Sequence, residues 1–168
     1  KLVKEHIHHL ENEARKLRES ESRYASAVKN SPGGIYIFDP LTMKIIESND
    51  QFNAMMGYNK EDISGLTVYD FYADKSIADE DISNILLKSF HSISNSQYKK
   101  KIGSYIVVDI NTCWSESGQS SVVIVSVQDV TQRNKAQEIA AKYKVLLENA
   151  QDIILFVSPD GKIIEANK

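Results

Sequence analysis

Few side chains in this sequence have the type and spacing needed for catalysis or metal binding. His6 and His9 are spaced i,i+3, so both could bind one metal ion from the same face of a helix. Three histidines within four residues of a charged helix (His8 is the third) are, however, more typical of a solvated surface. The segment 32–34, Pro-Gly-Gly, lacks both the lysine and the spacing of a phosphate-binding loop. We therefore expect no metal site and no enzyme within these residues; any catalysis would reside elsewhere in a longer protein.

Two further side chains are candidates for chemistry. Cys113 is the one cysteine of the 168 residues, which excludes an internal disulfide and fits a reducing compartment. Since it has no histidine near it in the sequence and is expected in mid-strand, a buried or interface thiol is favoured over a nucleophile. His91 is expected at the C-terminal end of a helix, where a surface imidazole compensates the helix dipole.

The composition is that of an ordinary globular protein, 42% hydrophobic and 26% charged with a net charge of −3, and the length favours one domain. The near-neutral charge gives no reason to expect nucleic acid or an anionic membrane as a partner. No apolar run approaches the roughly 20 residues that cross a bilayer. The sequence predicts a soluble, cytoplasmic chain without membrane contact.

Residues 1–30 are predicted to form one long helix, because they contain no Gly or Pro and are rich in Glu, Lys, Arg, Leu and Ala. Apolar residues follow a heptad pattern interrupted only by Glu21. We expect this helix to pair in a parallel homodimer, with a single helix lying on its own domain as the alternative. The heptad positions are Val3, Ile7, Leu10, Ala14, Leu17, Tyr24 and Val28.

A hairpin and three helices are predicted next. The strands cover residues 35–39 and 43–48, with Pro40 in the turn. A short helix over 51–56 is capped by Ser48 or Asn49 and stopped by Gly57. Asn59, with Asp62 three residues later, starts another. A longer helix is expected over 82–92, with Ile82, Ile85, Leu86 and Phe90 on one face.

Three strands, over 97–102, 105–115 and 119–128, complete the predicted module. In the middle strand the even-numbered residues 106–114 are the more apolar and should face the core; the last strand is apolar on both faces, which indicates that the back of the sheet is covered too. Asp129 and Gln132 resemble a capping box for a helix over 132–149 with a second heptad seam. The predicted divisions are 1–30 (helix), 31–131 (module), 132–149 (connecting helix) and 150–168.

Residues 150–168 begin a second copy of the module. Residues 24–40 align with 143–159 at a constant offset of 119, and residues 44–49 align with 162–167 after a turn one residue shorter. Nine identities lie in these stretches, and the apolar positions agree between them. The second copy stops before its helices and remaining strands.

In this order and spacing the chain resembles the PAS domain family. The resemblance rests on residues 30–40, Ile46-Glu-Ser-Asn49, Met56-Gly-Tyr58, Glu61-Asp-Ile-Ser-Gly65 and Asp129-Val-Thr131, and it covers 24–131 fully and 143–168 in part. It implies an α+β fold: a five-stranded antiparallel sheet with helices on one face, here flanked by long amphipathic, coiled-coil-like helices. It also implies a sensor or relay module in a multidomain signalling protein, with histidine kinases of two-component systems as the usual hosts.

The resemblance implies where a ligand and a signal would act. A small ligand would lie between the longer helix and the sheet, although these side chains could equally fill a core, and Asp129 and Thr131 would pass the change to the output helix. A reactive flavin cysteine motif is missing; haem ligation by His91 is a weaker alternative, and no cofactor is expected. A ligand-free dimerisation module is the rival function. The pocket candidates are Met55, Met56, Tyr58, Phe71, Tyr72, Ile85, Phe90 and Trp114.

Overall fold

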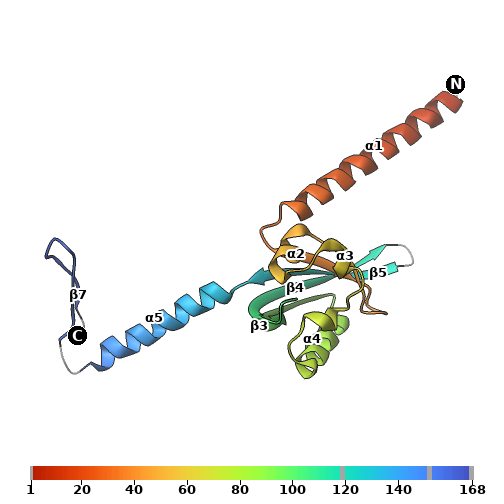
Figure 1. Cartoon of the computed structure of the whole chain (residues 1–168). Coiled ribbons are helices and arrows are strands. Elements are labelled where there is room, and N and C mark those ends of the chain that lie inside the picture. The colour runs from red at the N-terminus through yellow and green to blue at the C-terminus, as the bar shows by residue number, and fades with distance from the viewer. Residues whose placement is uncertain (1, 118–119, 151–152, 167–168) are drawn as a thin grey trace. The chain divides into compact units, whose positions relative to one another are not determined.

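The computed structural model describes residues 2–117, 120–150 and 153–166, which divide into two compact units, Lys1–Asp129 and Val130–Lys168 (Figure 1). The first contains a long helix, the sheet and the short helices between its strands. In chain order its elements are α1 (Leu2–Lys29), β1 (Gly34–Phe38), β2 (Ile45–Ser48), α2 (Asp50–Met56), α3 (Lys60–Ile63), η1 (Val68–Phe71), α4 (Lys75–Leu87), β3 (Phe90–Lys99), β4 (Tyr105–Ser117) and β5 (Ser120–Asp129).

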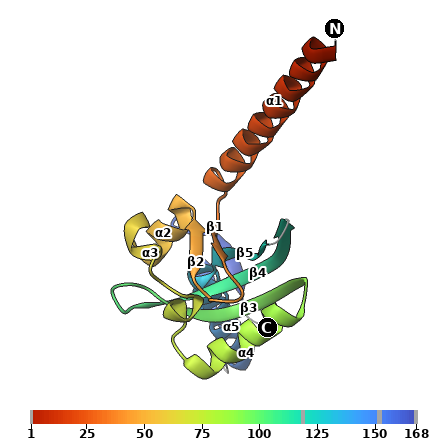
Figure 2. The same ribbon diagram turned by 90° about the vertical axis from the view of Figure 1, so that its right-hand side faces the viewer.

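The five strands form one antiparallel sheet in the order β2-β1-β5-β4-β3. The predicted α+β fold with a five-stranded antiparallel sheet is therefore confirmed. β5, the last strand along the chain, is the central one and pairs with both β1 and β4. Figure 2 shows α4 alongside β3, with α2 and α3 nearer β1 and β2. Buried side chains of these helices and of η1 pack on one face of the sheet.

The short helices begin and end where the local sequence predicts. The Asn49 side chain accepts a hydrogen bond from the Phe52 N–H at the start of α2, and Gly57 ends that helix with a left-handed φ of 77°. Asn59 and Asp62 form the predicted capping box of α3.

Buried and more exposed side chains alternate along β4 and β5, and the buried set marks the inner face of the sheet. In β4 the residues 106, 108, 110 and 112 are buried and Trp114 is half-buried, as predicted. In β5 the inner valines 123, 125 and 127 are fully buried. Val122 and Ile124, on the other face, are half-buried.

The predicted helix over 82–92 and the predicted start of the third strand are wrong. α4 begins seven residues earlier, at Lys75, because the Asp74 side chain caps it through the Ser76 N–H at 2.7 Å. It ends at Leu87, so Phe90 lies on β3 and not on the helix face with Ile82. The strand was hidden because the register shifts between Ile93 and Ser96, which interrupts the alternation in the sequence.

α1 spans nearly the predicted range. The heptad residues Ile7, Leu10, Leu17 and Tyr24 are exposed on it. Within the residues that the structure describes, no helix has the length and apolar character to cross a membrane.

The second unit contains α5 (Thr131–Asn149) and a two-stranded hairpin of β6 (Leu155–Val157) and β7 (Ile163–Ala166). The predicted capping box of Asp129 and Gln132 is wrong, because α5 starts one residue earlier than expected and Val130 is its N-cap residue. Along α5 the seam residues Ile139, Tyr143 and Leu146 are exposed.

Candidate functional site

The space between the short helices and the inner face of the sheet is filled by aromatic rings. The ring of Tyr36 on β1 lies 4.7 Å from that of Phe52 on α2 and 5.5 Å from that of Phe71 on η1, measured between centroids. Phe71 also lies 6.1 Å from Tyr98 on β3. All four residues are fully buried, so they pack the helical layer against two strands of the sheet, β1 and β3.

Three tyrosine hydroxyls meet inside this cluster. The hydroxyls of Tyr36 and Tyr98 are hydrogen-bonded to each other at 3.0 Å. The Tyr72 hydroxyl is buried and makes no hydrogen bond of normal geometry within the described part of the chain. Burial raises the pKa of all three phenols, so they are neutral at physiological pH. The cluster therefore offers neutral donors and acceptors inside an apolar shell.

Asp81 brings a carboxylate from α4 to the rim of this cluster. It accepts a hydrogen bond from the Ser96 hydroxyl on β3 at 3.2 Å. Burial raises the pKa of this carboxyl, while the hydroxyls of Ser96 and Tyr72 and the nearby His91 act in the opposite direction. α4 is thus linked to β3 by a polar contact beside the tyrosines.

A second polar contact joins α4 to the sheet. The indole nitrogen of Trp114 on β4 donates to the main-chain oxygen of Ile85 at 2.9 Å. Because Ile85 itself is buried, the helix is held by an apolar side chain and a hydrogen bond at the same residue.

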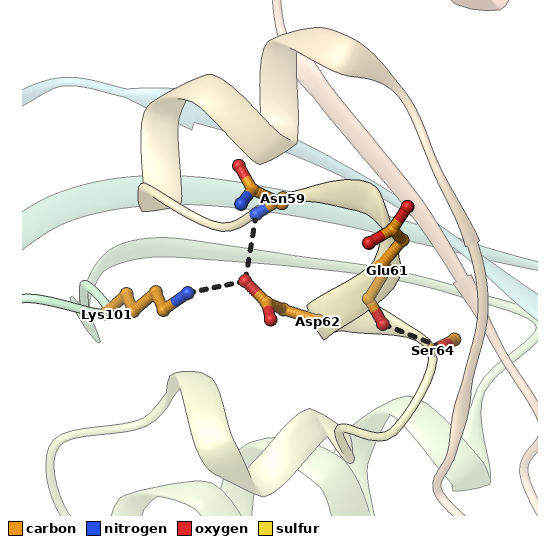
Figure 3. Close-up of polar contacts among 5 residues, drawn as sticks. All are labelled: Asn59, Glu61, Asp62, Ser64 and Lys101. Carbon is orange, nitrogen blue, oxygen red and sulfur yellow. Dashed lines mark hydrogen bonds and ion pairs between the residues drawn. The ribbon is translucent and has the colours of Figure 1, made fainter.

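The turn between β3 and β4 is held against α2 and α3 by contacts of Lys101. The Lys101 ammonium forms an ion pair with the Asp62 carboxylate, which also accepts the Asn59 N–H at the start of α3 (Figure 3). The Lys101 N–H donates to the Met56 carbonyl at 3.0 Å, and its ammonium lies 5.7 Å from the centre of the Tyr58 ring. The ion pair lowers the pKa of Asp62. One lysine thus ties the turn to both α2 and α3.

A family model described as "PAS domain" matches residues 32–132, more than half of the chain. The chain belongs to the PAS domain family. The match begins just after α1 and ends at the start of α5.

Solved PAS domains have the same fold. One, from an HTR-like protein of Haloarcula marismortui, is 21% identical with a TM-score of 0.59, over 71% of this chain and 98% of that one. A PAS domain from a two-component sensor histidine kinase is 18% identical with a TM-score of 0.57, over 67% of this chain and 98% of that one. An RNA-binding Light-Oxygen-Voltage receptor is 16% identical with a TM-score of 0.62, over 75% of this chain and 37% of that one. At these identities the likeness shows the fold.

The PAS domain brings most of the predicted pocket residues together. Four are buried in its core, and three are half-buried against it. Phe90 is the exception: it is 65% exposed and opposes Cys113 across β3 and β4, on the outer face of the sheet. The buried four are Met56, Phe71, Tyr72 and Ile85; the half-buried three are Met55, Tyr58 and Trp114.

Several core residues of this PAS domain were not predicted for the site. Tyr36 and Tyr98 lie on strands, whereas most of the predicted pocket residues lie on the helical side of the space. Their inward positions could have been found from alternation with Phe38 and Ser96. Asp81 gave no signal of its own, because it is one of three acidic residues in a row.

The other candidate groups are separated from one another. His91 is half-buried on β3 and is not at a helix end as predicted, because α4 stops at Leu87. His9 is paired with Glu13 along α1 at 3.4 Å. Cys113 is exposed on β4. Over residues 2–117, 120–150 and 153–166, no three His, Cys, Asp or Glu side chains are grouped as metal ligands.

An open pocket lies at the N-terminal end of α4. It has a volume of 710 Å³ and combines two tyrosines with one acidic and one basic side chain. Tyr72 belongs both to this lining and to the buried cluster, so the pocket lies beside the aromatic core. Its lining residues are Tyr69, Tyr72, Ala73, Lys75 and Asp79.

The two predicted relay residues stand on either side of one junction. Asp129 is the last residue of β5 and Thr131 is the first residue of α5, so only Val130 separates strand from helix.

Proposed function

We propose that this PAS domain is a signal-relay module of a multidomain protein, of the sensor histidine kinase kind, and that it transmits a change in its core to α5. The observation that supports the proposal is the central position of β5 in the sheet, directly before α5. This central strand pairs with β1 and β4, and a single residue joins it to the helix. A shift of β5 along its own axis would therefore be transmitted to α5 through a single residue, Val130. The module itself is proposed to be non-catalytic and cytoplasmic.

The input would be a small molecule or a partner that changes the packing of α4 on the sheet. α4 is held there by the Ser96–Asp81 hydrogen bond, at the rim of the aromatic cluster, and by the Trp114–Ile85 hydrogen bond. An apolar interior with a few convergent polar groups is typical of small-molecule sites. A ligand with one polar end, facing the Tyr72 hydroxyl, suits this arrangement.

The test of the relay uses the intact signalling protein. Asp129→Ala and Thr131→Ala are each introduced, and output is measured with and without the stimulus. We expect the basal output to persist while its response to the stimulus falls by about ten-fold, the size of a typical coupling free energy. Gln128→Ala, one residue before the junction on an exposed position, is the matched control. Unchanged regulation in both junction variants would exclude this route.

A ligand-free dimerisation module is the second candidate function. It is favoured by the exposed apolar seams, Ile7, Leu10 and Leu17 on α1 and Ile139 and Leu146 on α5. Light scattering over a range of concentrations, combined with mass spectrometry of the purified protein, separates the two. A parallel dimer that dissociates in the Leu10→Glu and Leu17→Glu variants, in a protein that retains no small molecule, would favour the dimerisation function. A monomer at all concentrations would exclude that function.

A further inference from the structure

α5 and the hairpin after it repeat the hydrogen bonds of α1 and its hairpin. The Asn30 side-chain amide donates to the Ser26 carbonyl at 2.9 Å, and Asn149 donates to the Val145 carbonyl at 2.8 Å. Both residues of each pair are 119 positions apart from their counterparts. The repeat in the sequence is thus also a repeat of contacts at the end of each helix.

The two hairpins pair in the same register. Each has a one-residue slip at the same place, between Ile37 and Phe38 in the first and between Phe156 and Val157 in the second. A slip moves every later side chain relative to its neighbour, so its recurrence is a strong sign of one shared fold. The corresponding pairs are Tyr36–Ser48 and Leu155–Ala166, Ile37–Glu47 and Phe156–Glu165, and Phe38–Ile45 and Val157–Ile163.

The turns agree as well, although the second is one residue shorter. Each is closed by a main-chain hydrogen bond to the lysine that starts the return, and each has a left-handed residue just before that lysine. The bonds are Asp39 N–H to Lys44 O at 3.0 Å and Ser158 N–H to Lys162 O at 2.8 Å; the left-handed residues are Met43 (φ 59°) and Gly161 (φ 86°).

Each helix also places a tyrosine on the outer face of its own hairpin. The Tyr143 ring lies 5.6 Å from the Phe156 ring. Tyr24, its counterpart, has its pKa raised by burial and by the nearby Glu47 and Cys113, which belong to the outer face of the first sheet. Phe156 occupies the position of Ile37, which pairs with Glu47.

The inner faces of the two hairpins differ sharply in solvent exposure. Tyr36, Phe38 and Ile45 are 2%, 1% and 4% exposed, whereas their counterparts Leu155, Val157 and Ile163 are 50%, 53% and 64% exposed. In the first hairpin the cover is known: β5 pairs along β1, and Phe52 of α2 lies on Tyr36. The second hairpin has a corresponding apolar face, and among the described residues β6 pairs with β7 alone.

We propose that residues 131–166 are the opening part of a second module of this fold, and that the inner face of β6–β7 is the docking surface for its remaining layer. The occupant is an antiparallel strand along β6 with apolar residues at alternate positions, as in β5, together with a helix that brings an aromatic ring. α5 then serves twice, as the helix leaving the first module and as the entry helix of the second.

One position sets a limit on how that helix approaches. A Cβ on Gly34 would lie 3.0 Å from the Cα of Phe52, so α2 sits directly on the glycine. The counterpart of Gly34 is Ile153, which is exposed. The docking helix of the second module must therefore stand further from β6 than α2 stands from β1.

The test attaches that layer to the full chain. Residues 50–129 are copied after Asn167, which aligns with Asn49, and amide hydrogen exchange is measured over 153–166 with and without the addition. Ile153→Gly is made in both proteins to remove the predicted clash. We expect exchange at 155–157 to slow at least about a hundred-fold in the extended Ile153→Gly protein, as strands gain core protection.

The control separates docking from mere attachment. Leu155→Asp changes the inner face and should abolish the protection, whereas Lys162→Asp, in the exposed turn, should leave it unchanged. Unprotected amides at 155–157 in the extended Ile153→Gly protein would overturn the proposal. Protection that survives Leu155→Asp would overturn it too, because the proposed face would then not be used.

Discussion

The side-chain oxygen of Asn49 accepts a hydrogen bond from the main-chain N–H of Ile35 at 2.8 Å, joining the end of one strand to the start of its hairpin partner. The same oxygen caps α2 through Phe52, at 2.9 Å. The amide nitrogen of Asn49 donates to the carbonyls of Val28 and Gly33. One buried side chain therefore links α1, β1 and α2.

Asn49→Ala should destabilise the protein by about 3 kcal/mol, because it removes a helix cap and leaves several partly buried main-chain groups without partners. Asn49→Asp is the matched variant: it keeps the two acceptor contacts and loses the two donor contacts, so it should cost less. Chemical denaturation of the three proteins measures this order. Equal losses for Ala and Asp would mean that the donor contacts to Val28 and Gly33 carry the stability alone.

The hydrogen bond between Tyr36 and Tyr98 should show strong coupling. Tyr36→Phe or Tyr98→Phe alone leaves a buried hydroxyl without its partner and should cost about 1–3 kcal/mol. The double variant removes both hydroxyls and should cost less than the sum of the single losses. A double-mutant cycle of unfolding free energies measures the coupling. Additive losses would show that the two hydroxyls act independently.

The hairpin and short helices were predictable because their signals are local. Asn49, Gly57 and the Asn59–Asp62 pair act within a few residues of the backbone that they shape. The tyrosine contact was not predictable in this way, since Tyr36 and Tyr98 are 62 residues apart on strands that are not neighbours. Their contact depends on the tertiary arrangement of the sheet and the layer packed on it, which no local pattern reveals.

Trp114 and Phe90, both predicted for the pocket, should now respond differently to substitution. Trp114→Phe loses the hydrogen bond to Ile85 and should cost about 1–2 kcal/mol. Phe90→Ala should change the unfolding free energy by less than about 0.5 kcal/mol, as is usual for an exposed position. Thermal unfolding monitored by circular dichroism compares the two. A loss for Phe90→Ala as large as that for Trp114→Phe would contradict the outer position of Phe90.

The error at Phe90 has a physical cause. Residues 82–90 carry apolar side chains at helical spacing, and this local pattern extends past Leu87. Pairing with β4 from Phe90 onward satisfies main-chain groups of both strands, whereas a longer helix would leave that edge of β4 without its neighbour. The register shift before Ser96 then conceals the strand from any test of alternation.

Asp81 should make stability depend on pH in the direction opposite to most carboxylates. Its pKa is raised by burial, so its contribution is fully present below the unfolded pKa of about 3.9 and is lost as the pH rises through the folded pKa. At pH 7, Asp81→Asn should unfold at the same or a higher temperature than the wild type, since the Asn oxygen still accepts from Ser96.

The comparison is repeated at pH 3.5, where more of the wild-type carboxyl is protonated than at pH 7 and the difference between the two proteins should shrink. Asp62→Asn serves as the contrast, because the pKa of Asp62 is lowered by Lys101 and its ionised form is the stabilising one. A melting temperature at pH 7 that is clearly lower for Asp81→Asn than for the wild type would contradict the assignment.

Only Val130 lies between the last residue of β5 and the first residue of α5, so a change in the length of α5 alters everything that follows the helix. Each residue of an α-helix turns by about 100°, so one residue inserted within α5 would rotate the apolar seam after the insertion by more than a quarter turn relative to the seam before it. Seven residues inserted within α5 would restore the seam while lengthening the helix by about 10 Å. Insertions of different length within α5 would therefore alter the angular position and the distance of the segment after the helix separately.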